Sequence, residues 1–319
     1  MRLLLRLGLL AGIVLLIALF NHNGWETVLS PLARAGPVLL WLVPLHAIPV
    51  ALDVMGWRAL LPGYVSFRAL LWIALVREAF NRLLPVANVG GEIVGIRMLM
   101  RSVPDPGMAA ASVVVETLLT LCSQLVFVAI GLVCLMRATD RFAFAASSMA
   151  VLAAAAATIG FLAALLRYGA VFERLGRLAQ ALASRALSDV RIVAHATSLD
   201  AAIRRLYTAP GRWLIAGAWQ LAGLLSSCAE TWLGLRWLGH PVGWPAAIAL
   251  ESLVQAARNF VFFVPAGLGV QELGFVGVGQ LLGLDAGTLI ALSLAKRLRE
   301  LILGIPTLTA TAAAVRLSG

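Results

Sequence analysis

Residues 77–97 read REAFNRLLPVANVGGEIVGIR, and this stretch decides how the rest of the chain is interpreted. Seven of its side chains are charged or amides, and they surround one proline and one glycine pair within otherwise apolar sequence. Ionisable groups at membrane depth are costly unless they face protein or water, and a backbone broken by Pro85 and Gly90-Gly91 is tolerated there only around a cavity. We therefore interpret the stretch as the floor of a polar cavity inside a membrane protein.

The composition of the chain predicts a polytopic membrane protein. Hydrophobic residues make up 61% of the 319 residues and charged residues 13%, and the mean hydropathy is +0.94, far outside the usual soluble range. The formal net charge of +10 does not indicate nucleic-acid binding, because the basic residues lie mostly between apolar runs. There they orient membrane spans and contact anionic lipid, and no aromatic and basic nucleic-acid module is present.

Six apolar runs are long enough to cross a membrane, namely residues 3–20, 36–55, 108–136, 142–166, 213–237 and 288–315. A signal peptide is the rival interpretation of the first run. Its end, ALFNHNGW, has no small-residue cleavage pattern, so we favour an uncleaved span. His46 in the second run is expected to be a packing residue with satisfied hydrogen bonds rather than a ligand.

Two further segments, 67–101 and 246–282, are interrupted by proline and glycine near their centres. We interpret each as a re-entrant hairpin of two half-length helices that leaves the membrane on the side from which it came. Between them, residues 167–212 carry eight arginines against three acidic residues, which places this segment in the cytoplasm. A helix on the membrane surface and a solvated connector both fit the segment. With these assignments both chain termini are predicted to be cytoplasmic.

The two interrupted segments resemble each other. PVANVGGE at 85–92 and PAGLGVQE at 265–272 each place a glutamate seven residues after a proline. Because a span, a hairpin and another span occur twice from opposite sides, we predict an inverted repeat within a single all-α membrane domain, 1–319. Its halves are 1–166 and 213–319, and the basic segment joins them.

Polar and charged side chains recur at helical intervals, so we predict that they face one shared cavity. The candidate cavity residues are Arg77, Glu78, Asn81, Arg82, Asn88, Gly90, Gly91, Glu92, Arg97, Glu116, Arg258, Asn259, Gln271, Glu272, Lys296, Arg297 and Glu300, and the hairpins are broken at Pro85, Pro265, Gly267 and Gly269. The alternative is that the charges only pair with one another to hold helices together, as Arg77 with Glu78 or Arg297 with Glu300.

These residues favour an anionic or strongly polar headgroup. The helix that begins at Gly90-Gly91 directs backbone N–H groups into the break, and several basic side chains are expected nearby. Apolar walls would accommodate acyl or polycyclic tails. We hypothesise an amphipathic lipid that moves between leaflets, with Glu92 and Glu272 as gating or proton-coupling carboxylates.

The run at 77–97, NFVFFVPAGLGVQELGF at 259–275 and SLAKRLRELILGIP at 293–306 resemble the lysylphosphatidylglycerol synthase transmembrane, or flippase-like, family. Within that family the last run is similar to the hopanoid-biosynthesis-associated membrane proteins. The resemblance covers nearly the whole chain. It implies a lipid translocase of the bacterial inner membrane that is built around two re-entrant elements and is related to the flippase half of the multiple peptide resistance factor.

The resemblance does not imply aminoacyl transfer, because full synthases continue into a soluble acyltransferase-like domain and the printed sequence ends at Gly319. We expect no enzymatic activity, metal or cofactor: the four histidines and three cysteines are scattered, and no P-loop or GxSxG motif is present. The expected partners are membrane lipids, with a second copy of the chain or a lipid-biosynthesis protein as a further partner. An intramembrane lipid-modifying enzyme and a scaffold for a lipid-synthesis complex remain alternatives.

Overall fold

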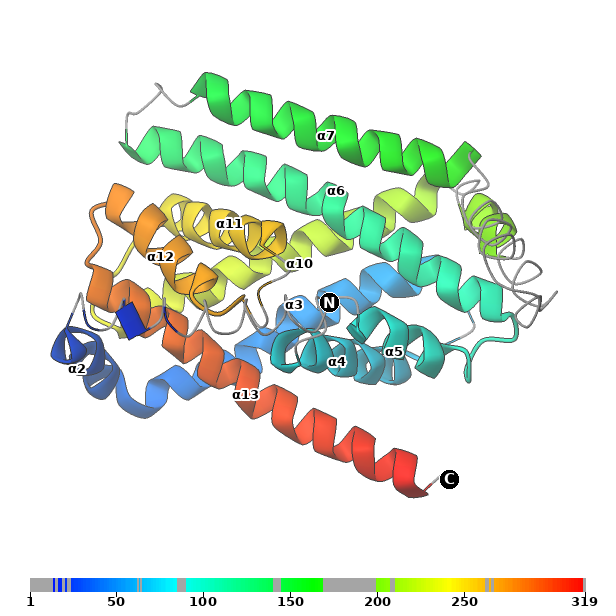
Figure 1. Cartoon of the computed structure of the whole chain (residues 1–319), viewed down its shortest axis with the longest axis horizontal. Coiled ribbons are helices and arrows are strands. Elements are labelled where there is room, and N and C mark those ends of the chain that lie inside the picture. Colours follow the sequence, from blue (N-terminus) through cyan, green and yellow to red (C-terminus); the bar gives the residue numbers. More distant parts are fainter. Residues whose placement is uncertain are drawn as a thin grey trace.

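The computed structural model describes residues 14, 17–18, 21, 24–61, 63, 65–84, 90–139, 145–168, 199–206, 210–261, 264 and 267–317. Every regular element among them is helical (Figure 1). Most of the first predicted span, most of the basic segment, and three predicted site residues, Pro85, Asn88 and Pro265, lie outside the described residues.

The described helices fall into two sets of similar order. The first set is α2 (Trp25–Ala35), the 3-10 helix η1 (Gly36–Trp41), α3 (Leu42–Leu60), α4 (Phe67–Leu83), α5 (Gly90–Leu99) and α6 (Pro106–Thr139). The second set is α7 (Ala145–Tyr168), α10 (Pro210–Trp237), α11 (Trp244–Phe260), α12 (Val270–Leu281) and α13 (Ala286–Leu317). Helix α7 falls within the predicted first half, 1–166, but we group it with the second set because it contacts α6 as α2 contacts α13.

Both interrupted segments consist of two short helices, as the sequence predicts. Helix α4 begins at a Ser66 cap and ends at Leu83, and the backbone at Leu84 is extended. Helix α12 begins after Gly269, whose φ of 77° belongs to the left-handed region that favours glycine. The short helices of each segment pack on each other, α4 on α5 and α11 on α12. Their re-entrant placement in a membrane remains a prediction.

The helices of the two sets have equivalent neighbours. Helix α4 packs on α13, and its counterpart α11 packs on α6; α2 likewise contacts α13, while α7 contacts α6. Helices α3 and α10 pack along each other at the centre. Figure 1 shows that α6 and α13 run in opposite directions, as do α3 and α10. This arrangement is consistent with two halves related by an approximate two-fold axis, as an inverted repeat requires.

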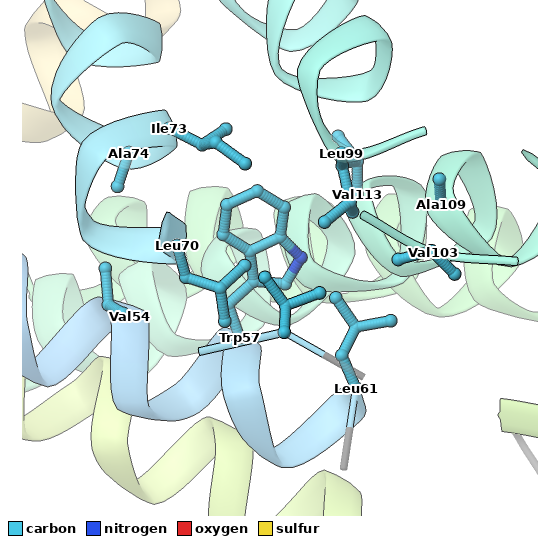
Figure 2. Close-up of a cluster of buried hydrophobic side chains, with 11 residues drawn as sticks. Val54, Trp57, Leu61, Leu70, Ile73, Ala74, Leu99, Val103, Ala109 and Val113 are labelled. Carbon is cyan, nitrogen blue, oxygen red and sulfur yellow. The ribbon is translucent and has the colours of Figure 1, made fainter. Parts of the chain in front are cut away.

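Apolar clusters support both halves. In the first half, Trp57 of α3 is fully buried among side chains from α4, α5 and α6, including Leu70, Leu99 and Val113 (Figure 2). The indole Nε1 of Trp57 donates to Ser112 Oγ at 3.3 Å, so its polar group is satisfied. A second cluster includes Phe275 of α12 with buried residues of α10, α11 and α13, and Val28 of α2 joins it. These cores fix the helices whose polar side chains form the site.

Two helical runs of the described chain are long and apolar enough to cross a membrane by length and composition, residues 25–60 and 106–139. The sequence predicts six spans, and that number remains a prediction. Helix α13 is long but carries Lys296, Arg297, Arg299 and Glu300 near its middle, which lowers its mean hydropathy. Its charged residues face protein rather than lipid, since Lys296, Arg299 and Glu300 are buried.

Candidate functional site

A polar cavity of about 370 Å³ lies between helices of both halves. It is lined by His46, Pro49, Val50 and Asp53 of α3, Ala74, Arg77, Glu78, Asn81 and Arg82 of α4, Glu92 of α5, Thr120 of α6, Gln220, Gly223, Leu224 and Ser227 of α10, and Gln255 and Asn259 of α11. The cavity therefore lies where the first hairpin packs against the central pair of helices, α3 and α10.

Arg77 organises the cavity wall on the first hairpin. Its Nη2 donates to carboxylate oxygens of both Glu92 and Glu116, the second at 2.8 Å. The guanidinium also lies over the Trp57 ring, with Cζ 4.7 Å from the ring centroid, so the apolar core holds it from behind. The Arg77 and Glu116 side chains are 10% and 4% exposed, whereas Glu92 is 24% exposed and faces the cavity. One buried cation thus binds a buried carboxylate and a carboxylate that the cavity reaches.

Asn81, one helical turn after Arg77, joins the two helices of the first hairpin. Its Oδ1 accepts from the backbone N–H of Gly91 at 2.9 Å, and its Nδ2 donates to Glu92 Oε1 at 3.3 Å. The side chain therefore satisfies a free N–H group in the first turn of α5 and orients the carboxylate there. One of the N–H groups at which an anion site was predicted, that of Gly91, is consequently bound by Asn81.

The second hairpin has the equivalent glutamate, Glu272, in a closed environment. Arg297 of α13 binds both of its oxygens, at 2.5 Å from Nε and 3.0 Å from Nη2. The same carboxylate accepts from Ser293 Oγ and from the backbone N–H of Gly269, each at 2.9 Å. Arg297 also donates to the Gly267 carbonyl at 3.0 Å. Glu272 is fully buried and does not line the cavity.

Two further ion pairs fill the second half outside the cavity wall. Arg258 binds Glu300, 3.2 Å away, and also Gln271. Lys296 binds Glu251, which also accepts from the Thr231 hydroxyl and from Gln255. Arg82 lies 3.8 Å from Glu300, and its side chain is 34% exposed. Arg82 is therefore held more loosely than the other basic side chains of these networks.

The structure separates the predicted residues into two groups. Arg77, Glu78, Asn81, Arg82, Glu92 and Asn259 line the cavity. The others for which the structure gives side-chain contacts, Glu116, Arg258, Gln271, Glu272, Lys296, Arg297 and Glu300, form hydrogen-bonded networks that do not line it. Gly90 and Gly91 begin α5 outside the lining, and Arg97 is exposed on the same helix. The structure therefore places only some of the residues that we predicted to face one shared cavity in its lining.

The alternative interpretation, that the charges only pair with one another, named the wrong partners for Arg77 and Arg297. Arg77 binds Glu92 and Glu116 rather than Glu78, and the carboxylate that Arg297 binds is Glu272 rather than Glu300. Arg77 and Glu78 are adjacent on a helix, so their side chains point in different directions. Arg297 and Glu300 are three residues apart and could meet, but Arg297 instead binds both oxygens of the buried Glu272 on α12. The lining also has three carboxylates against two guanidinium groups, so its charge is more balanced than the basic residues led us to expect.

Several cavity-lining residues were absent from the predicted set, and two of them, Asp53 and His46, are ionisable. Asp53 lines the cavity, and so does His46, whose ring nitrogens each lie 2.9 Å from a carboxylate oxygen, one of Glu78 and one of Glu230. His46 was expected to be a packing residue, and the structure gives both of its ring nitrogens carboxylate partners and places it in the site. Gln220 Oε1 has no hydrogen-bond partner among the described residues and belongs to a cavity-lining side chain. An isolated polar residue in an apolar run was the signal for all three.

Within the part of the chain that the structure describes, no three His, Cys, Asp or Glu side chains are grouped as metal ligands. The arrangement instead offers carboxylate, guanidinium and amide groups to a strongly polar ligand. Compared with known families, residues 3–306 match the model described as "Lysylphosphatidylglycerol synthase TM region". Comparisons with curated proteins and with solved structures returned no match.

Proposed function

The chain belongs to the lysylphosphatidylglycerol synthase transmembrane family and is a membrane protein, and we propose that it is a flippase-like lipid translocase of the bacterial inner membrane. The observation that carries the proposal is the polar cavity lined by both halves of the chain. Polar and ionisable groups are retained at membrane depth where a polar solute passes. The meeting of two interrupted helical segments is also where transporters of this architecture bind substrate.

The volume of the cavity limits what it can enclose. At about 370 Å³ it is near the lower end of small-ligand pockets, enough for a headgroup and too small for a whole lipid. We therefore propose that the headgroup passes through the cavity while the tails remain in the bilayer. This division supports an amphipathic substrate, because only its polar part needs shelter from hydrocarbon.

The headgroup is proposed to be strongly polar, with an anionic group bound at Arg82. Carboxylates, guanidinium groups and the amides of Asn81, Gln220 and Asn259 together offer both donors and acceptors. A hopanoid-related lipid is the specific substrate that we propose, since the run at 293–306 resembles the hopanoid-associated subgroup. No enzymatic activity is part of the proposal.

A gene deletion tests the proposal. Hopanoids and phospholipids are quantified separately in the inner and outer membranes of the deletion strain, and the strain is then complemented with wild type or with Glu92→Gln. We expect unchanged total lipid with a shifted distribution, restored by the wild type and not by the variant. Arg97→Gln is the matched control, because Arg97 is an exposed residue of the same helix outside the cavity.

Other outcomes of the deletion contradict transport. A missing lipid with accumulation of its precursor indicates the lipid-modifying enzyme or an enzyme partner. An unchanged distribution together with the loss of a lipid-synthesis complex indicates the scaffold. In either case the translocase is withdrawn as the primary function.

The proposed topology has cytoplasmic termini, with the first hairpin reached from the cytoplasm and the loop before α11 on the opposite side. In a background without Cys122, Cys134 and Cys228, we expect Asn88→Cys to react with an impermeant thiol reagent in inverted membrane vesicles. Pro241→Cys, at an exposed position in the loop before α11, is the control and is expected to react in intact spheroplasts. Labelling of Asn88→Cys in spheroplasts alone contradicts this topology.

A further inference from the structure

His46 contacts one carboxylate of each half of the molecule. Its Nε2 lies 2.9 Å from Glu78 Oε1 of α4, and its Nδ1 lies 2.9 Å from Glu230 Oε1 of α10. The second oxygen of Glu230 binds Arg299 of α13. His46 itself is on α3 and lines the polar cavity. The imidazole ring therefore joins α3, α4 and α10, and Glu230 extends the connection to α13.

The two contacts of His46 require a proton. A neutral imidazole has one N–H, so it can donate to one carboxylate while its other nitrogen only accepts. With both carboxylates ionised, a neutral ring would place a nitrogen lone pair 2.9 Å from a carboxylate oxygen. Both contacts become hydrogen bonds when the set of three side chains holds one additional proton, either on the ring or on a carboxyl group.

The charged groups around the ring differ in how firmly they are held. Glu230 is 1% exposed and bound by Arg299, whereas Glu78 is 26% exposed and faces the cavity. The other charged groups that line a pocket together with His46 are Arg77 and Arg82 of α4, Glu92 of α5, Arg299 and Glu300 of α13 and, on α3 itself, Asp53. The contact to Glu78 is consequently the one that separates first when the proton leaves.

We propose that His46, Glu78 and Glu230 form a proton-binding site, and that occupancy of this site controls the position of α4 beside the cavity. The proton is exchanged with water in the cavity. On release it passes to a water molecule, and the Nε2 and Glu78 Oε1 lone pairs then repel each other. Helix α4 loses its hydrogen bond to α3 at this point and is held there by the apolar core, while Glu230 stays with Arg299. This inference rests on the proposed translocase and would couple lipid movement to the proton.

The proton itself is detected on the purified protein without any transport assay. Protein labelled with nitrogen-15 histidine is studied by NMR, and infrared spectra record protonated carboxyl groups; His46→Gln and Glu78→Gln assign the signals. At neutral pH we expect either a His46 ring with two N–H groups or a neutral ring with a protonated carboxyl band that Glu78→Gln or Glu230→Gln removes. A neutral ring without such a band overturns the proposal.

The effect on α4 is measured by backbone hydrogen exchange at about pH 6 and about pH 8.5, a change in proton activity that is large enough to alter the charge of a free imidazole. After correction for intrinsic rates, we expect exchange in α4 to rise about tenfold relative to α11 at the higher pH. Glu78→Gln should abolish this rise, because the new amide can donate to a neutral ring. Equal protection of α4 at both pH values overturns the gating part.

Transport is tested separately in vesicles of phosphatidylethanolamine and phosphatidylglycerol that carry fluorescent phosphatidylethanolamine as the probe. If wild type moves the probe, we expect its rate to depend on pH and the dependence to be lost in Glu78→Gln, whatever the rate of that variant. If wild type and Glu78→Gln move the probe with the same dependence on pH, the proposed coupling of lipid movement to the proton is overturned. A proton site confirmed by spectroscopy in a protein that fails the deletion test overturns only the translocase.

Discussion

The two hairpins have the same motif and opposite environments. Glu92 follows Pro85 as Glu272 follows Pro265, and each glutamate is in the first turn of the second short helix. Glu92 faces the cavity and shares Arg77 with Glu116. Glu272 is fully buried, and both of its oxygens are bound.

The difference arises from the helix that supplies the arginine. Arg77 belongs to α4, within the same hairpin, so one side of Glu92 remains open to the cavity. Arg297 belongs to α13, which packs over α12 and closes the second site. In any single conformation of a transporter built from inverted repeats, the two similar halves differ in how open they are to the central cavity. The difference between Glu92 and Glu272 therefore supports the translocase proposal.

The largest expected effect compares the two glutamates directly. Glu272→Gln removes the carboxylate that Arg297 binds through two nitrogens, in a fully buried site, so we expect a loss of about 3–5 kcal/mol in the free energy of unfolding. Glu92→Gln leaves Arg77 bound to Glu116, and its loss should be about 1 kcal/mol. Unfolding in detergent, followed by circular dichroism, measures both. Equal losses of unfolding free energy would mean that protein encloses the two glutamates to the same extent.

The paired environments show what the sequence could predict. Apolar runs and the Pro and Gly breaks correctly place α6, α7, α10, α13 and the interruptions in both hairpins, because helix length and backbone breaking are local properties. The partners of Arg77 and Arg297 depend on contacts between helices distant in sequence, which periodicity does not determine. Periodicity also does not show that one glutamate of the repeated motif is fully buried while the other faces the cavity. His46 carries no signal that distinguishes a bridge from packing.

A smaller effect compares the helix contacts of the two hairpins. A Cβ at Gly95 of α5 would lie 2.6 Å from Arg77 Cδ, and the Arg77 side chain is fixed by two carboxylates and the Trp57 ring. Gly95→Ala is therefore expected to cost about 1–3 kcal/mol of unfolding free energy. At Gly274 of α12 a Cβ would meet Val254 at 3.4 Å, an ordinary contact.

Gly274→Ala is the matched control for this contact. Alanine restricts the unfolded chain and favours helix, so we expect a neutral result or a gain of up to about 1 kcal/mol. The same detergent unfolding experiment measures both variants. If Gly95→Ala is as well tolerated as its control, the Arg77 side chain is free to move, and the rigid wall inferred for the first hairpin is wrong.

The smallest expected change in stability is at Arg82. Its side chain is 34% exposed and lies 3.8 Å from Glu300, which keeps Arg258 at 3.2 Å. Arg82→Ala should therefore change the unfolding free energy by less than about 1 kcal/mol.

Arg82 also lines the cavity, and a loosely held cation can rearrange toward an anionic headgroup at little cost. We thus expect a clear loss of lipid movement in the deletion strain, measured as lipid distribution, with nearly normal stability. Normal distribution in that strain would remove the anionic headgroup from the proposal and leave a neutral polar one, bound by the amides and carboxylates of the cavity.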